Sequence, residues 1–478
     1  MKKEVAVAAA VTAAAMVVGT AVLLRHWKRR SERRWRLAQR ILRKFANDSA
    51  TPVAKLWRVA DEIASEAEGN SSSLCKIVSA IAPLPTGEEK GTFYGVNLRG
   101  TDFVIVRARL EGKNEPLSEL HKEKVQIPYG IMANGGSSKE LFDFIALELA
   151  KFISLHSETD SDRSSKERIL GFTISHPTDQ NRTASIDVKL NNVSTDDKVG
   201  KELANDINHA LEKRGVDMRV FTVVKDTIGH LAGGRYYSSE SVAAVSLGTG
   251  TDVAYVESSQ QTSTIIHNNS AETVVNMQWG NFSSSHLLLT EYDFFEKLIS
   301  GMCLGEIVRR VLLKMAKEVA LFGDSVPPKL AIPYLLRPPP DMAAMHQDTT
   351  EDYDIVHEKL NQIFEISNST PMAREIVAEV CDVVTERGAR LVGAGIVGIV
   401  KKLGRMKNRK SVITVEGGLY EHYRIFRNYL HSSVWEMVGS DLSDNIVIEH
   451  CHGGSPAGSI FVAASQTRNA DLVDDGFC

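Results

Sequence analysis

The segment Val223–Tyr237 (VVKDTIGHLAGGRYY) holds one carboxylate, Asp226, in a glycine-rich setting where a general base could stand. Such a carboxylate must be enclosed enough to be basic and open enough to reach a substrate hydroxyl. The preceding residue is Lys225, and a cation beside Asp226 should make it a poorer base; if Lys225 points away, only its backbone matters. His230 follows four residues later, before a Leu-Ala-Gly-Gly turn. Taken alone, the segment is more typical of a strand that ends in an ordinary turn.

Two glycine-containing hairpin turns could hold phosphate. The stretch Leu247–Thr251 (LGTGT) offers the backbone N–H groups of Gly248 and Gly250, a geometry that can cradle an anion. Glycines in hairpin turns are also common for structural reasons alone. A second turn of similar type, Asn97–Asp102 (NLRGTD), stands at the corresponding place in the first half of the chain. The pair therefore favours phosphate handling.

The elements that would position these residues follow from hydrophobic periodicity. We expect helices at Trp35–Glu68, Leu141–Leu155, Lys201–Arg214, Phe294–Phe322 and Met372–Leu403, two strands within Thr92–Leu110, and further strands at Ile169–Ser175, Val220–Val224, Ser241–Leu247, Val253–Glu257 and Ser411–Val415. The order of hairpin, helix, strand and helix occurs twice. This predicts a duplicated α/β architecture.

Composition limits the class of protein. With 478 residues and 43% hydrophobic content, the chain can form two or more cores with a sizeable cleft. The net charge of −4 gives no indication of nucleic-acid binding. Its five cysteines are scattered without a CxxC pair, which argues against a disulfide framework or a zinc site and fits a reducing compartment.

The N-terminus carries an apolar run of twenty residues, Val5–Leu24, about the length that crosses a bilayer as a helix. A basic block follows at Arg25, Lys28, Arg29, Arg30, Arg33, Arg34 and Arg36. This flank predicts a single-pass anchor with the body in the cytosol and differs from a cleaved signal peptide. The alternative is an uncleaved plastid or mitochondrial targeting segment.

Long collinear blocks give the chain a resemblance to eukaryotic hexokinases, specifically the membrane-anchored plant type, from Trp35 to Gln466. They include LPTGEEKGTFYGVNLRGT, DTIGHLAGGRYY, LGTGTDVAYVE, NMQWGNF, FEKLISGMCLGEIVRRVLLKMA and ERGARLVGAGIVGIVKKLGR. The resemblance implies an α/β fold of the actin-like ATPase (ribonuclease H-like) type, with two lobes that close around a hexose and ATP-Mg. It also implies an anchor on an organelle surface, with the mitochondrial outer membrane as the leading expectation.

The implied organisation has five parts. They are a membrane anchor and basic flank at 1–30, an N-terminal helix of the large lobe at 35–74, a small lobe at 75–218, a large lobe at 219–457, and a C-terminal helix returning to the small lobe with a tail at 458–478.

On the sugar side, Asp226 matches the family's general base, and Ser175 and Glu296 match retained sugar contacts. The other contact positions have changed type. Lys225 and Asp252 stand for asparagines, Leu190 and Asn191 for a Thr-Lys pair, and Gln278 for a glutamate.

On the nucleotide side, the resemblance keeps the phosphate and adenosine glycines and the turn residues Gly248, Thr249, Gly250, Gly417, Gly418, Gly100 and Thr101. Asn97 replaces a carboxylate that orders the magnesium ion's water, and Arg99 replaces a glycine. Arg99 could block the approach of phosphate or supply positive charge lost elsewhere. We therefore expect ATP-Mg binding to be weakened by Asn97, and we assign no side chain to the metal itself.

These departures lead to one main hypothesis and two alternatives. Each buried polar group left unpaired costs about 1–3 kcal/mol, and about 1.4 kcal/mol on a barrier is a tenfold change in rate. We expect a hexokinase-like protein with low or absent phosphotransfer that acts in sugar sensing, signalling or scaffolding at a membrane. The alternatives are an active ATP-dependent hexokinase of glycolysis, and an actin-like fold that binds only nucleotide or a protein partner.

Overall fold

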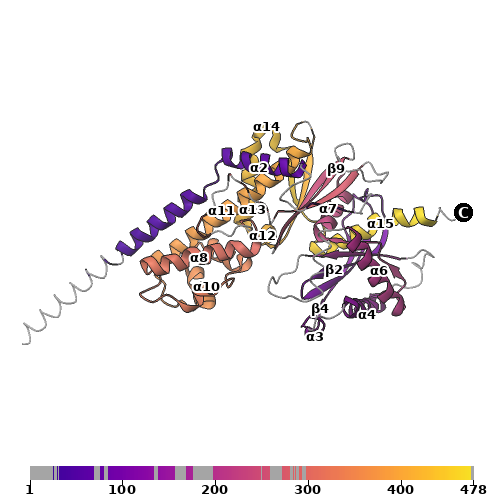
Figure 1. Ribbon diagram of the computed structural model, residues 1–478, viewed down its shortest axis with the longest axis horizontal. Helices are drawn as coiled ribbons and strands as arrows, with labels where there is room; N and C mark the ends of the chain where they lie inside the picture. The colour runs from indigo at the N-terminus through magenta and orange to yellow at the C-terminus, as the bar shows by residue number, and fades with distance from the viewer. Residues whose placement is uncertain are drawn as a thin grey trace, which may run out of the picture. The chain divides into compact units, whose positions relative to one another are not determined.

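Two mixed β-sheets form the framework of the computed structural model (Figure 1). The structure describes residues 25, 30, 32–68, 76–79, 84–133, 138–156, 168–175, 197–248, 250–258, 272–279, 282, 284, 286, 290–292, 298–407 and 409–474. The predicted anchor at residues 5–24 lies outside them. Within the described part of the chain, no helix combines the length and the apolar character needed to cross a membrane.

The first sheet has the order β4-β3-β2-β5-β6, and β7 also pairs with β5. Its strands are β2 (Gly91–Arg99), β3 (Asp102–Leu110), β4 (Ser118–Gln126), β5 (Arg168–Ile174), β6 (Met218–Arg219) and β7 (Val223–Lys225). Strands β2, β3 and β4 are antiparallel, whereas β5 is parallel to β2, β6 and β7.

The second sheet repeats this plan in the order β1-β10-β9-β8-β11-β12. Its strands are β1 (Lys76–Ser79), β8 (Ser241–Leu247), β9 (Thr251–Ser258), β10 (Glu272–Gln278), β11 (Ser411–Glu416) and β12 (Ile446–His450). Strands β8, β9 and β10 are antiparallel, and β11 is parallel to β8 and β12. The predicted duplication is confirmed.

The helices connect and cover these sheets. Their bounds are α2 (Val53–Glu68), α3 (Tyr129–Ala133), α4 (Ser138–His156), α6 (Asp197–Lys213), α7 (Asp226–Tyr237), α8 (Gly301–Val319), α9 (Ala343–His346), α10 (Asp354–Phe364), α11 (Pro371–Lys402), α12 (Gly418–Glu421), α13 (Arg424–Val438), α14 (Ser440–Ser443) and α15 (Gly458–Asp474), with short helical turns η2 (Pro328–Ala331), η3 (Pro338–Met342) and η4 (Ser455–Ala457).

Two of the predicted helices have different limits. The helix expected over Trp35–Glu68 is interrupted at 50–52, where Pro52 precedes α2 and has no N–H to continue the preceding helix. The helix expected over Phe294–Phe322 corresponds to α8, which runs from Gly301 to Val319.

Helix α7 corrects the prediction of a turn at Leu-Ala-Gly-Gly, because the whole segment from Asp226 is helical. Its glycines provide close packing instead. A Cβ on Gly229 would lie 2.9 Å from the backbone of Gly458, and one on Gly233 would lie 2.9 Å from the ring of Phe461. Glycine is used here because α15 packs directly on α7 (Figure 1).

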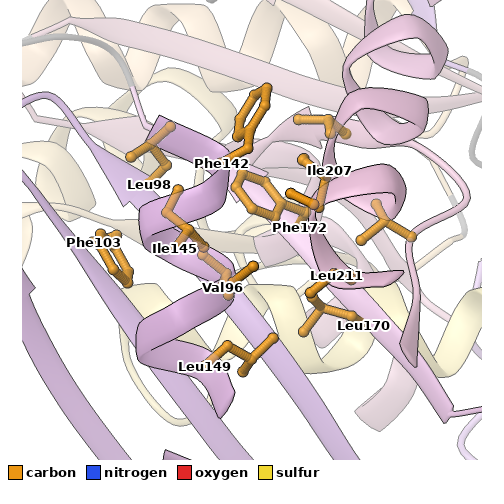
Figure 2. Close-up of a cluster of buried hydrophobic side chains, with 14 of the residues drawn as sticks. Val96, Leu98, Phe103, Phe142, Ile145, Leu149, Leu170, Phe172, Ile207 and Leu211 are labelled. Carbon is orange, nitrogen blue, oxygen red and sulfur yellow. The ribbon is translucent and has the colours of Figure 1, made fainter. Parts of the chain in front are cut away.

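The core of the first sheet lies on both of its faces. Helices α4 and α6 cover one face, and Figure 2 shows how their side chains meet those of the strands. The residues are Phe142, Ile145 and Leu149 of α4, Ile207 and Leu211 of α6, and Val96, Leu98, Phe103, Leu170 and Phe172 of the sheet. On the other face, Val104, Val106 and Ala108 of β3 pack with Ile460, Phe461 and Ala464 of α15.

The chain forms two compact units. One consists of the N-terminal part up to Ala50 with Leu288–Asp293 and Cys303–Arg387; the other consists of Thr51–Leu287, Phe294–Met302 and Gly388–Cys478. The second unit contains both sheets, α7 and α15. The lobe boundaries expected at 218/219 and 457/458 both fall inside it and stay a prediction.

Candidate functional site

The candidate general base, Asp226, is the first residue of α7 and follows directly on the last residue of β7. Its side chain is buried. Its Oδ1 accepts the backbone N–H of Thr227 at 2.8 Å, and the Thr227 hydroxyl lies 3.4 Å from the same oxygen. The carboxylate is therefore held in one orientation at the carboxyl end of a parallel strand, a common position for ligand-binding groups in α/β folds.

Lys225 is only 2% exposed, and the carboxylates of Asp252 and Asp226 act on its ammonium group. Burial lowers the pKa of Lys225, and the two carboxylates oppose that shift. Burial raises the pKa of Asp252 to about 6, with Lys225 acting in the opposite direction and Asp226 in the same one. Two oppositely charged residues expected at asparagine positions are thus buried near enough to act on each other electrostatically. The alternative in which Lys225 points away from the acid does not describe this structure.

A row of paired residues crosses the second sheet beside this charge pair. In the strand register, Glu416 pairs with Ser246, Ser246 with Asp252, and Asp252 with Gln278. Directly paired residues have side chains on the same face of a sheet. The Ser246 hydroxyl lies 2.9 Å from that of Thr227. The fold thereby brings the predicted contact residues Asp252 and Gln278 into one row that is joined to the start of α7.

His230 extends this network toward the chain before α15. Its Nδ1 lies 3.4 Å from the Ser246 hydroxyl, and its Nε2 lies 3.2 Å from the carbonyl oxygen of Ser455. Burial raises the pKa of Glu416, and the nearby His230 offsets part of that rise. We assigned neither His230 nor Ser246 from the sequence. The helical spacing of four residues from Asp226 could have indicated His230, whereas Ser246 depends on the register.

The first hairpin brings together three predicted residues. Asn97 is completely buried, and its Nδ2 donates to the hydroxyl of Thr173 at 2.9 Å and lies 3.4 Å from that of Ser175. Its Oδ1 accepts Nε–H of Arg99 at 2.8 Å. Both sides of the amide are therefore occupied by protein. Thr173 was missed because a threonine within a buried strand is usually structural.

The turn of this hairpin is formed by Gly100 and Thr101, and the Thr101 carbonyl accepts the N–H of Ile127 at 3.0 Å.

Glu416 and Gly417 lie at the end of β11 in the other sheet. Gly417 has φ +111°, and a Cβ there would lie 2.3 Å from the carbonyl oxygen of Leu247.

The second glycine turn, which follows Leu247, lies beside Gly417 because Gly417 packs closely against the Leu247 backbone. The Gly248 carbonyl accepts the N–H of Gly301 at 3.0 Å, and Gly248 N–H donates to the Gly250 carbonyl at 3.1 Å. Gly418 begins α12 directly after Gly417. The glycines expected on the nucleotide side, Gly248, Gly250, Gly417 and Gly418, therefore gather at the ends of β8 and β11.

Four other predicted residues lie outside the described residues. They are Leu190, Asn191, Thr249 and Glu296.

The donors offered to a magnesium ion are few. The described residues contain no cluster of three or more His, Cys, Asp or Glu side chains placed to hold a metal. In nucleotide sites Mg²⁺ is usually held by one or two carboxylates together with phosphates. Asn97 offers an amide whose oxygen already accepts from Arg99, and Asp226 has the Lys225 ammonium next to it. These two oxygen donors, Asn97 and Asp226, therefore each have a basic residue acting on them.

The duplicated sheets and the two glycine turns define a phosphate-handling α/β protein, and comparisons place it more closely. Family models described as hexokinase match residues 41–236 and 242–465. Hexokinase-1 of Spinacia oleracea is 43% identical over 98% of this chain and 99% of its own length. Hexokinase-2 of Solanum tuberosum is 42% identical over 99% of this chain and 100% of its own length. The chain belongs to the hexokinase family, with plant hexokinases among its relatives.

Solved structures agree with this assignment. A hexokinase from Schistosoma mansoni, complexed with glucose, superposes with a TM-score of 0.72 and 25% identity, covering 90% of this chain and 99% of its own. The fold is the α/β hexokinase fold. Members of this family use ATP as the phosphoryl donor.

Proposed function

We propose that this chain binds a hexose and a nucleotide, that its phosphoryl transfer is impaired, and that it acts in sugar sensing or signalling at an organelle membrane. The observation that supports this most is the buried Lys225 ammonium, on which the carboxylates of Asp226 and Asp252 both act. Phosphoryl transfer depends mostly on positioning and charge neutralisation, and both are altered at this point.

The charge pair affects the base and the sugar site together. A general base must gain a proton from the attacking hydroxyl, and here a buried lysine acts on the carboxylate that would receive it. Asparagine side chains both donate and accept hydrogen bonds, whereas a lysine only donates and a carboxylate only accepts. Lys225 and Asp252 also act on each other, so they are less able to orient a hexose hydroxyl.

We also infer weakened binding of ATP-Mg. The amide of Asn97 replaces a carboxylate, and its Oδ1 is bonded to the Arg99 guanidinium. A fixed cation next to a metal site opposes the metal by charge repulsion. The donor set at this hairpin does not fit magnesium.

The decisive experiment uses the full-length chain in detergent. Hexose-dependent ADP formation is measured together with calorimetric titration of glucose. We expect glucose binding with turnover at least about a thousandfold below a typical enzyme rate of about 10 s⁻¹. Turnover near that rate would overturn the proposal, and failure to bind glucose would leave only a scaffold.

A restoring variant tests the cause. Replacing Lys225→Asn together with Asp252→Asn removes both opposite charges and leaves Asp226 without the neighbouring ammonium, and adding Leu190→Thr with Asn191→Lys restores the other contact pair. We expect hexose-dependent ADP formation to rise by about tenfold or more, since each restored polar contact contributes about 1–3 kcal/mol. No gain would place the defect in the hairpin around Asn97.

The second candidate function is an active ATP-dependent hexokinase that phosphorylates glucose or fructose at the 6-hydroxyl in glycolysis. It is favoured by the fixed orientation of Asp226 and by the convergence of Gly248 and Gly417. The relatives quoted above also carry the name hexokinase. The turnover measurement decides between the two.

A further inference from the structure

Three cations gather on one face of the first sheet at the end where β2 turns into β3. Arg99 pairs with Asp102 and Asp102 with Gln126, while Lys124 pairs with Val104 and Lys122 with Val106. Alternate residues of a strand share a face, so Arg99, Lys122 and Lys124 share one. We call these three residues the hairpin basic cluster.

Arg99 is held so that part of its guanidinium remains available. Its Nε–H donates to Asn97 Oδ1 at 2.8 Å, which fixes the planar group against a buried amide. Among the residues that the structure describes, Asn97 is its only hydrogen-bond partner. A guanidinium has five N–H donors in a fork that matches phosphate oxygens. The terminal nitrogens of Arg99 can therefore donate to a ligand.

Lys122 lies close to Arg99. Its Nζ donates to the carbonyl oxygen of Gly453 at 2.5 Å. Burial lowers the pKa of Lys122, and the Arg99 charge adds to that shift while Cys451 and Glu421 oppose it. Arg99 and Lys122 therefore lie near enough for their charges to act on each other, with Glu421 as the carboxylate that acts on Lys122, and two such cations favour an anion.

Among the described residues, Asp102 is the carboxylate ion-paired to the cluster, because its Oδ2 lies 3.2 Å from Lys124 Nζ. The Lys124 side chain is 58% exposed. Three cations thus face one ion-paired carboxylate, Asp102, and the more distant Glu421, so the positive charge is in excess.

The chain before α15 completes the environment. Gly453 and Gly454 have φ values of +74° and +77°, and a Cβ on Gly454 would lie 3.6 Å from Lys122 Nζ. The backbone then enters η4 and the long helix α15, whose Ser459 lies against Gly95 of β2. The amino end of a helix adds partial positive charge on this side of the sheet. This partial charge adds to that of the three side chains and does not substitute for it.

We propose that the hairpin basic cluster binds the phosphate chain of a polyphosphate anion without a metal ion, with the Arg99 guanidinium supplying charge where magnesium does not fit. The ligand class is a metal-free nucleoside triphosphate or a free pyrophosphate, which share that chain. Magnesium removes two negative charges from ATP, and Arg99 repels the ion, so the cluster prefers the uncomplexed anion. This deepens the proposed nucleotide binding and rests on it.

The test is calorimetric titration of the full-length chain in detergent with ATP plus EDTA, with ATP plus excess Mg²⁺, and with pyrophosphate plus EDTA. We expect metal-free ATP to bind at least about tenfold more tightly than Mg-ATP. Arg99→Gln should weaken metal-free ATP by about tenfold or more, the effect of losing one charge-assisted contact. Binding of pyrophosphate assigns the affinity to the phosphate chain, and binding of ATP alone assigns it to the nucleotide; both support the cluster.

Further variants separate a loss of binding from a loss of folding. Lys124→Gln alters an exposed side chain and should weaken metal-free ATP severalfold. Arg109→Gln is the matched control, since Arg109 stands at the far end of the same hairpin and pairs with Glu111. Replacing Asn97→Asp with Arg99→Gly should reverse the preference toward Mg-ATP.

Equal or tighter binding of Mg-ATP by the unaltered chain would overturn the inference, as would unchanged binding in both Arg99→Gln and Lys124→Gln. Hexose turnover at an ordinary rate would instead overturn the proposed impairment. The two failures are therefore distinguishable.

Discussion

A lysine buried next to two carboxylates changes what a hexose site can do, because its charge must be compensated before any substrate arrives. Lys225 is completely enclosed, and Asp252 is 6% exposed. Taking two charges out of water is costly, and their attraction offsets that cost only while both partners are present. The pair is thus better described as one coupled replacement than as two independent changes of residue.

This coupling predicts the outcome of a double-mutant cycle. Lys225→Asn and Asp252→Asn should each lower the free energy of unfolding by up to about 3–5 kcal/mol, since each removes one of two opposite buried charges that act on each other. The double variant should lose much less than the sum. Urea unfolding of the four proteins gives the interaction energy, and strictly additive losses would contradict the pair.

The raised pKa of Asp252 predicts a pH-dependent stability. Its pKa is about 6 in the folded protein against a reference of 3.8. Between these values the folded state keeps a proton that the unfolded state has lost, so stability falls as pH rises from about 4 to 6, by up to about 3 kcal/mol. The pKa of Lys225 is lowered in the folded protein from a reference of 10.5, so stability rises with pH between the folded value and that reference.

Urea unfolding from pH 4 to 8 checks this dependence. The difference between the unaltered chain and the Lys225→Asn, Asp252→Asn double variant isolates the pair from other titrating groups. Parallel curves for the two proteins would show that Asp252 titrates normally.

The sequence identified Lys225 and Asp252 as changed positions but not as partners. Their proximity requires β7 of one sheet and β9 of the other to meet at the start of α7, and that depends on register and packing. The same holds for Arg99 and Lys122, which come from β2 and β4. Candidate site residues can be predicted from sequence motifs, whereas the residues that they interact with depend on the fold.

At the scale of elements, α7 is the part of the site that sequence patterns describe worst. Ten of its twelve residues are buried, so the segment has no polar face and gives no helical periodicity. Its glycines then suggest a turn. The hairpins were predicted well because short strands rich in β-branched and aromatic residues flank a short glycine turn, as in β2 and β3.

The close packing of α7 predicts opposite effects for two glycine substitutions. Gly229→Ala places a methyl group 2.9 Å from the Gly458 backbone and should lower the free energy of unfolding by about 1–3 kcal/mol. Gly130→Ala in α3 meets nothing within 4 Å, so the better helix propensity of alanine should leave stability unchanged or raise it by up to about 1 kcal/mol.

Thermal and urea unfolding of both variants measure the difference. A neutral Gly229→Ala would mean that α15 can move away from α7. Hexose-dependent activity measured alongside would report whether that movement shifts Asp226.

At the scale of the whole molecule, two sheets with the same order of antiparallel and parallel strands place their loops in equivalent positions. The first hairpin and the glycine turn after β8 are such equivalents, and this explains why a pair of turns in the sequence was informative. Both sheets lie within one compact unit together with every described candidate residue. The predicted anchor belongs to a different part of the chain and has to be tested by itself.

We propose that residues 5–24 hold the full-length chain in an organelle membrane, with the mitochondrial outer membrane as the first to examine, and that the body faces the cytosol. Twenty residues without a charge suffice for one crossing, and the basic block after them favours the cytosolic side.

The chain should stay in the membrane pellet after washes with high salt and alkaline carbonate, and protease added to intact organelles should remove a C-terminal tag. The variant Ala14→Lys with Val18→Lys keeps the length of the run but adds about 2.5–3.5 kcal/mol per lysine to insertion, so it should move to the supernatant. Release of the unaltered chain by salt alone would show that the basic block binds the surface without a membrane crossing.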